Sequence, residues 1–142
     1  MLINPNAYTF EELEIGQTET IEIQLLLSDI ESFCILTSDY HPLHSSKRYA
    51  IKNGYDDIIA HGLLISSFSS ALIGMKLPGE NALITSQSFK YRHPTYPGDR
   101  LLISGKIVFK ETTFNTIEVK VKIHNQASKL VASGLYKIKL RD

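Results

Sequence analysis

The alternation of apolar and polar residues is clearest near the start of the chain. Between Thr18 and Leu26, apolar residues alternate with polar ones: Ile21, Ile23 and Leu25 with Thr20, Glu22 and Gln24. A period of two is that of a strand with one buried face. The pattern then changes, because Ser28 stands three positions before Glu31, as in a capping box. This spacing predicts a short helix that begins after Ser28 and runs to Leu36.

The longest helical pattern lies in the middle of the chain, from Gly62 to Lys76. Its apolar residues recur at the spacing of one helical face: Leu64, Phe68, Ala71, Leu72 and Met75. Many other positions are serines: Ser66, Ser67, Ser69 and Ser70. Because serine is a mediocre helix former, this composition predicts close packing against a wide, curved surface. Pro78-Gly79 ends this helix. Earlier in the chain, a further helical turn is expected at 46–51.

The last third of the chain is rich in strands. The segments 83–91, 101–109, 117–123 and 132–140 show strand patterns, and the connections at 110–115 and 125–129 are short. Short connections predict antiparallel hairpins. One strand, a central helix and four sequential strands predict an α+β fold, with one domain over residues 1–142. A strongly bent antiparallel sheet could bury the helix, and its open edges favour dimerisation.

Composition and charge exclude several classes of protein. Hydrophobic residues make up 43% and charged residues 21% of the chain, which is typical of a folded, soluble domain. The 15 basic and 15 acidic residues balance, whereas a general nucleic-acid binder is expected to be basic. No stretch resembles a signal peptide or approaches the ~20 apolar residues of a membrane span. The single cysteine, Cys34, has apolar neighbours and predicts a buried thiol in a cytoplasmic protein.

The segment Thr37-Ser38-Asp39-Tyr40-His41-Pro42-Leu43-His44 carries the strongest chemical signal. Pro42 fixes its own φ and favours an extended His41, so a bent loop rather than a helix is expected here. Such a loop can direct Asp39 and His44 at one point. A carboxylate and an imidazole that share a point can hold and polarise a water molecule. The segment therefore predicts proton-transfer chemistry.

Two further motifs follow in a fixed order. They are Ala60-His61-Gly62-Leu63 and, after Phe89-Lys90-Tyr91-Arg92-His93-Pro94, the turn Tyr96-Pro97-Gly98-Asp99. Together with Asp39–His44 they resemble the MaoC-like, (R)-specific enoyl-CoA hydratases, a family with the hot-dog fold. That family has Ser-Gly-Asp-x-Asn-Pro-Leu-His, an Ala-His-Gly helix start, and an arginine-proline segment before a Pro-Gly-Asp turn. The resemblance runs from about residue 28 to residue 109.

The resemblance implies a reaction and its catalytic groups. Water would add reversibly to the double bond of an enoyl thioester and give an (R)-3-hydroxyacyl product. Asp39 and His44 would activate one water molecule, and the Gly62 N–H would stabilise charge on the thioester oxygen. No cofactor is needed, because coenzyme A or acyl carrier protein is part of the substrate. The enzyme would be a homodimer of the hot-dog type, in which a bent sheet wraps a long central helix.

The resemblance also suggests where the substrate lies. The acyl chain would run along the start of the central helix, beside Leu63 and Leu64, with Phe68 and Tyr91 as walls. The phosphates of the acyl carrier would meet surface cations such as Arg92.

Two positions depart from the family pattern. Ser38 stands where the family usually has glycine, a change that matters if φ is positive there. His41 stands where the family has asparagine, which helps to position substrate and water. A histidine can still donate a hydrogen bond at that position, but it is larger and can become charged. It could reshape the site, alter specificity or impair hydration.

Several alternatives remain open from the residues alone. Asp39, His41 and His44, with His61 as a fourth ligand, could hold a metal ion, although the resemblance explains this pattern without one. His61 is otherwise expected to have a structural role before the helix. The chain could also be a dehydratase that acts on a carrier-protein substrate, or a binder of acyl thioesters without activity. A hot-dog thioesterase is disfavoured, because no carboxylate lies on the central helix between residues 66 and 70.

Overall fold

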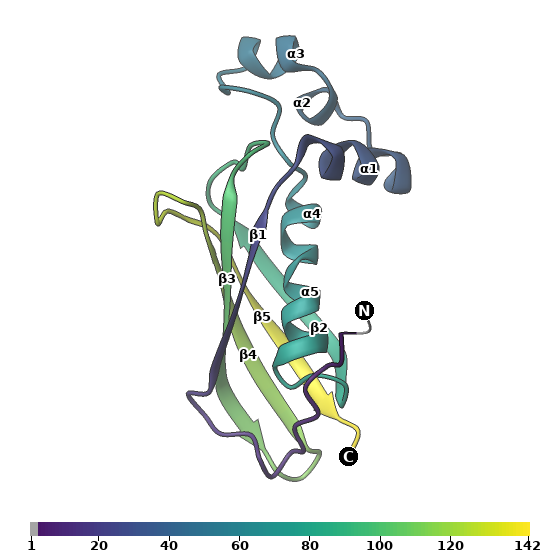
Figure 1. Ribbon diagram of the computed structural model, residues 1–142, viewed down its shortest axis with the longest axis vertical. Helices are drawn as coiled ribbons and strands as arrows, with labels where there is room; N and C mark the ends of the chain where they lie inside the picture. The colour runs from purple at the N-terminus through teal and green to yellow at the C-terminus, as the bar shows by residue number, and fades with distance from the viewer. Residues whose placement is uncertain (1–2) are drawn as a thin grey trace.

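The computed structural model describes residues 3–142 as one antiparallel sheet with a helix packed on one face (Figure 1). The sheet has five strands in the order β1-β3-β4-β5-β2. Their bounds are Thr18–Gln24 (β1), Ala82–Tyr91 (β2), Arg100–Glu111 (β3), Thr116–His124 (β4) and Leu130–Leu140 (β5). All neighbours pair antiparallel. For β3 with β4 and β4 with β5, the short connections predicted this. The α+β class and the hot-dog arrangement expected from the sequence are therefore confirmed.

The central helix covers the predicted range with one break, at Phe68. It comprises α4 (Gly62–Ser67), α5 (Ser69–Ala71) and a final turn of π-helix, η1 (Leu72–Lys76). Leu64, Ile65, Leu72 and Ile73 are at most 7% exposed and form part of the core. The predicted apolar face is only partly correct, because Ala71 is exposed and the buried face turns toward Ile65 and Ile73 instead.

Two of the four helix serines explain how closely the helix approaches the sheet. Ser66 and Ser69 are buried, whereas Ser67 and Ser70 face solvent. The Ser69 hydroxyl lies 2.6 Å from the hydroxyl of the fully buried Tyr136 on β5 and shares a hydrogen bond with it. A small polar residue thus satisfies a buried phenol and leaves little space between helix and sheet. The predicted close packing is confirmed for this pair of serines.

The sheet presents one apolar and one polar face. Along β4 the residues facing the helix are fully buried: Ile117, Val119, Val121 and Ile123. Their neighbours Lys120 and Lys122 lie on the opposite, outer face, which solvent covers. The alternation read from the sequence therefore separates core from surface correctly.

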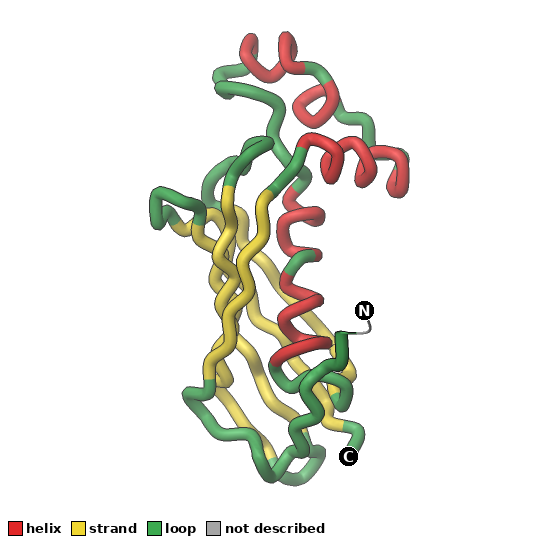
Figure 2. Tube along the Cα trace, viewed as in Figure 1, coloured by secondary structure: helices red, strands yellow, loops and turns green. Residues whose placement is uncertain are grey.

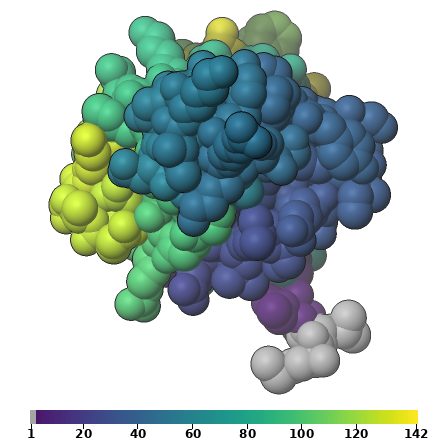
Figure 3. All heavy atoms as spheres, turned by 90° about the horizontal axis from the view of Figure 1, so that it is seen from above, coloured from purple at the N-terminus to yellow at the C-terminus, as the bar shows by residue number. Residues whose placement is uncertain are grey.

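Three short helices cover the end of the molecule at which the central helix begins (Figure 2). They are α1 (Leu27–Thr37), α2 (Pro42–Ser45) and α3 (Lys47–Lys52). Figure 3 looks onto this end, and the blue atoms of these helices form much of its surface. The prediction that Ser28 caps α1 is wrong, because Ser28 lies in the first turn of this helix. The residue before the helix is Leu26, whose N–H donates to Asp29 Oδ2 at 2.8 Å. Among the described residues, no helix is both long enough and apolar enough to cross a membrane.

Candidate active site

The end of α1 places Asp39 beside the start of the central helix. Ser38 ends α1 in the left-handed conformation, with φ 60° and ψ 19°, so the chain reverses sharply. The Asp39 N–H then donates to Thr37 Oγ1 at 3.2 Å, and the His41 N–H donates to Asp39 Oδ1 at 3.1 Å. The first bond holds the Asp39 backbone, and the second fixes one carboxylate oxygen. The other, Oδ2, remains available on a side chain that is 51% exposed.

His44 lies on a one-turn helix and not on a loop. The expectation that no helix forms here is wrong, because Pro42 occupies the first position of α2, where a missing N–H costs nothing. His41 is extended as predicted, with ψ 133°, and its Nδ1 accepts the Leu43 N–H at 3.2 Å. His41 thus caps α2, the role in which asparagine is favoured.

The His44 ring is held in one tautomer by a backbone carbonyl. His44 Nδ1 lies 2.7 Å from the Ile59 carbonyl oxygen, which can only accept, so Nδ1 carries the proton. The lone pair of the neutral ring is therefore on Nε2. Partial burial lowers the pKa of His44, and the Ile59 bond opposes this only in part. His44 is consequently arranged as a neutral proton acceptor.

His61 forms the floor beneath this pair. It is 3% exposed, and its Nε2 lies 3.0 Å from the Asp39 carbonyl oxygen and 3.9 Å from Asp39 Oδ2. Since the carbonyl must accept, His61 Nε2 carries a proton. The His61 and His44 rings are stacked, with centroids 3.8 Å apart, and Phe33 packs on His61 at 4.7 Å. The structural role expected for His61 fits this arrangement.

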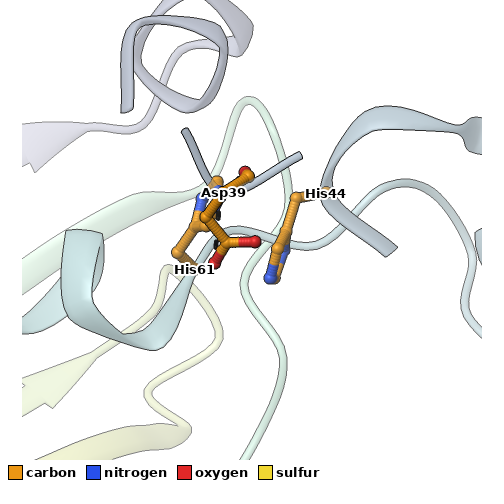
Figure 4. Close-up of side chains that lie close together, drawn as sticks. All are labelled: Asp39, His44 and His61. Atoms are coloured by element: carbon orange, nitrogen blue, oxygen red, sulfur yellow. Dashed lines mark hydrogen bonds and ion pairs between the residues drawn. The ribbon is translucent and has the colours of Figure 1, made fainter. Parts of the chain in front are cut away.

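Asp39, His44 and His61 come from three separate segments and meet at one point (Figure 4). One side-chain nitrogen or oxygen from each lies within 4.8 Å of the others, a group able to hold a metal ion. His41, a ligand in the metal alternative, is not part of the group, and its Nδ1 accepts the Leu43 N–H instead. His61 Nε2 also points its proton at a carbonyl, so it offers no lone pair to a metal in this state.

Gly62 begins the central helix directly after His61. A Cβ atom at this position would lie 3.0–3.1 Å from the Tyr91 ring, so glycine allows the ring to cover the helix start. The Tyr91 hydroxyl donates to Ser66 Oγ at 2.9 Å. Gly62, Tyr91 and Arg92 line a pocket of about 230 Å³. Gly62 thus lines a small cavity, whereas Asp39 and His44 are not among the residues that line it.

The remaining predicted substrate residues divide into two groups. Leu63 is 67% exposed on the surface of the helix start. Leu64 is 7% exposed, and Phe68 packs against the same core, so neither lines the pocket at Gly62. The structure therefore brings Tyr91 and Arg92 to Gly62 but turns Leu64 and Phe68 inward.

Sequence reasoning missed the second pocket at His44. This pocket, of about 480 Å³, lies on the α1 side and is lined largely by apolar groups, among them Cys34, Ile35, Tyr40 and Ile58. Cys34 is buried as predicted, and burial, with the nearby Asp39 charge, raises the pKa of its thiol. The thiol therefore stays protonated and unreactive beside His61 Nε2, 3.7 Å away.

Comparison with known proteins shows which family the chain resembles. Residues 11–128 match the model of the MaoC like domain. The chain is 33% identical over 130 residues to an (R)-specific enoyl-CoA hydratase of Rhodospirillum rubrum, covering 86% of this chain and 90% of that protein. It is 38% identical over 90 residues to a 3-hydroxybutyryl-CoA dehydratase of Methylorubrum extorquens, covering 63% of this chain but only 57% of that longer protein.

A solved structure agrees with the sequence match. The (R)-hydratase of Aeromonas caviae involved in PHA biosynthesis superposes with a TM-score of 0.87 at 25% identity, covering 92% of this chain and 98% of that one. The family match extends over most of the chain and includes every residue of the Asp39–His44–Gly62 site. This chain therefore belongs to the MaoC-like dehydratase family.

Proposed function

We propose that the protein is a hydro-lyase that reversibly adds water to the double bond of an enoyl-CoA. The observation that carries this proposal is the convergence of Asp39 with a His44 whose Nε2 lone pair is free, beside the glycine that starts the central helix. The relatives named as enoyl-CoA hydratases and a 3-hydroxybutyryl-CoA dehydratase support it.

Hydration requires one proton to leave water and one to reach the substrate. The water oxygen bonds to the β-carbon, the double-bond electrons move toward the thioester oxygen, and a proton is returned to the α-carbon. In this proposal His44 Nε2 and Asp39 Oδ2 hold the water, and His44 accepts its proton. Attack of the held water on the face of the β-carbon next to the pair would fix the product as the (R)-3-hydroxyacyl thioester.

Gly62 would stabilise the charge that develops on the thioester oxygen. The first N–H groups of a helix have no partner within the helix, and the helix dipole favours negative charge there. Residue 62 carries no side chain of its own to shield this N–H, and because the Tyr91 ring already fills the space of a Cβ, the thioester would approach from the side away from that ring. The acyl chain would enter by way of the pocket at Gly62 and Tyr91.

The Asp39→Asn and His44→Ala variants test the proposal. Each should lower crotonyl-CoA hydration by about 10²–10⁴-fold, the usual contribution of a positioned acid or base. The measurement is loss of the enoyl-thioester absorbance with time, and circular dichroism checks the fold of each variant. Turnover retained in both variants would remove the pair from the mechanism.

A second candidate function follows from His41, the residue that departs from the family pattern. If this histidine abolishes activity, the protein is a binder of acyl thioesters and not an enzyme. The structure favours activity, because His41 Nδ1 caps α2 as an asparagine would. The His41→Asn variant should therefore hydrate crotonyl-CoA within a few-fold of the natural protein. Activity that appears only in this variant would favour the binder.

A further inference from the structure

Charge is unevenly distributed along this electrically neutral chain. Residues 1–89 contain 11 acidic and 4 basic side chains, whereas residues 90–142 contain 4 acidic and 11 basic ones. The second part comprises the end of β2 and all of β3, β4 and β5. A net charge of zero therefore conceals a basic region, and such asymmetry within a chain points to an anionic ligand.

The strand register gathers part of this charge on the outer face of the sheet. Lys106 on β3 pairs directly with Lys120 on β4. Lys122 on β4 and Lys90 on β2 are both opposite Ser133 of β5, so they flank it on the same face. All four lysines are exposed, and none forms an ion pair with any of the described residues, 3–142. Like charges placed opposite each other destabilise a sheet, which suggests a compensating anion.

Part of this face is hollowed into a pocket of about 420 Å³. Lys90, Arg92 and Lys120 line it together with the Ser88 and Ser133 positions and the apolar Leu135. Arg92 also lines the pocket at Gly62, so it borders both cavities. Arg92 follows directly after the end of β2, where its N–H donates to the Val131 carbonyl at 2.8 Å. A ligand that passes around this strand end can therefore reach both cavities.

We propose that the pocket lined by Lys90, Arg92 and Lys120 binds the phosphate-bearing nucleotide end of coenzyme A. This inference rests on the proposed function, because it assigns the far end of the same substrate. Coenzyme A carries a diphosphate and a 3′-phosphate at the opposite end of its pantetheine arm from the thioester. Arginine binds phosphate in a bidentate way, lysine acts as a compact positive charge, and Leu135 offers an apolar contact to the base.

The shape of the site favours a small molecule over an acidic protein. The pocket volume falls in the range of small-molecule ligand sites, and three of the residues that line it are cationic. The arrangement also explains the position of Arg92: the thioester lies at Gly62, the arm passes Arg92, and the phosphates reach Lys90 and Lys120.

The Lys90→Glu, Lys120→Glu and double variants test this assignment with two substrates. Crotonyl-CoA has the phosphates, whereas crotonyl-pantetheine keeps the thioester and the arm without any phosphate. Each single variant should raise KM for crotonyl-CoA a few-fold, and the double variant about tenfold, since contacts between solvent-exposed charges are individually weak. Turnover of crotonyl-pantetheine should not change. Lys139→Glu is the matched control, because this exposed lysine lies on β5 outside the pocket.

Three outcomes would overturn the assignment. Equal loss with both substrates would mean that the variants damage the site itself. An equal effect of Lys139→Glu would mean that total charge, and not the pocket, attracts the substrate. A loss seen only with a crotonyl group on acyl carrier protein would assign the face to a protein partner.

Direct binding separates this inference from the proposed function. Adenosine 3′,5′-bisphosphate, which carries no acyl group, should bind the natural protein in calorimetry and bind the double variant at least tenfold more weakly. If this difference appears in a protein that hydrates no crotonyl-CoA, the pocket assignment holds and the proposed activity fails. If hydration is normal but the bisphosphate binds both proteins equally, the activity holds and the pocket assignment fails.

Discussion

At the scale of single residues, the contacts around His44 prepare its imidazole for proton transfer. The Ile59 carbonyl fixes the proton on Nδ1 and leaves Nε2 as an acceptor. Burial, together with the stacked His61, lowers the pKa of His44 below its ordinary value of 6.5. Burial and His61 therefore favour the neutral imidazole that a general base requires, and the Ile59 bond opposes them only in part.

The pH profile of hydration should report this state. If neutral His44 is the base, kcat/KM for crotonyl-CoA falls as the pH drops through the pKa of His44. Because that pKa is lowered, the acid limb should lie below pH 6.5, and the rate should be constant from there to neutral pH. Stopped-flow or steady-state rates between about pH 4.5 and 8 check this. An acid limb centred above 6.5 would contradict the assignment of His44 as a neutral base.

Individual residues of the site were predictable to different degrees. Asp39, His44 and Gly62 could be read from the sequence, because spacing around Pro42 and before the long helix marked them. Ile59 could not, since its contribution is a backbone carbonyl that any residue supplies. The stacking of His61 on His44 was equally hidden, because it depends on how α2 packs against the chain before α4.

At the scale of elements, the end of α1 decides where Asp39 lies. Ser38 adopts φ 60°, a conformation that costs an L-residue with a side chain more than it costs glycine. The family pattern has glycine at this position, and the positive φ supplies the physical reason. Ser38 is therefore a point of strain between α1 and the Asp39 carboxylate.

Replacing Ser38 by glycine should remove this strain. We expect Ser38→Gly to raise the free energy of unfolding by about 0.5–1 kcal/mol, measured by urea denaturation. Ser28→Gly is the matched control, since Ser28 lies within the first turn of α1, where glycine weakens the helix by a similar amount. A Ser38→Gly protein that is no more stable than the natural one would show that the turn holds no strain.

Long elements were predictable because their periodicity is set by burial on one face. The range 62–76 and the four later strands agree with the structure to within a few residues. Short elements were not predictable in this way: α2 has four residues, and Pro42, read as a helix breaker, begins it. The orientation of the central helix was also only partly predicted, because the buried Ser66 and Ser69 give no hydrophobic signal.

At the scale of the whole molecule, the two sheet edges differ in character. The β1 edge is short and carries Glu19 and Glu22, and charged residues discourage pairing at an edge. The β2 edge has ten residues and no charge before Lys90, and it exposes 48% of Leu83 and 39% of Ile84. An uncharged, partly apolar edge of this length suits pairing with a second copy of the chain. We therefore expect the homodimer to form through β2.

Placing a charge on this edge tests the interface. The natural protein should have twice the 16.0 kDa mass of one chain in light scattering, and Leu83→Lys should shift it toward the monomer. Because Leu83 is already half exposed, the change should leave the fold intact, as circular dichroism can verify. Leu102→Lys is the control: Leu102 is 44% exposed on β3, a strand paired on both sides. A monomeric natural protein, or a Leu83→Lys protein that stays dimeric, would exclude β2 as the interface.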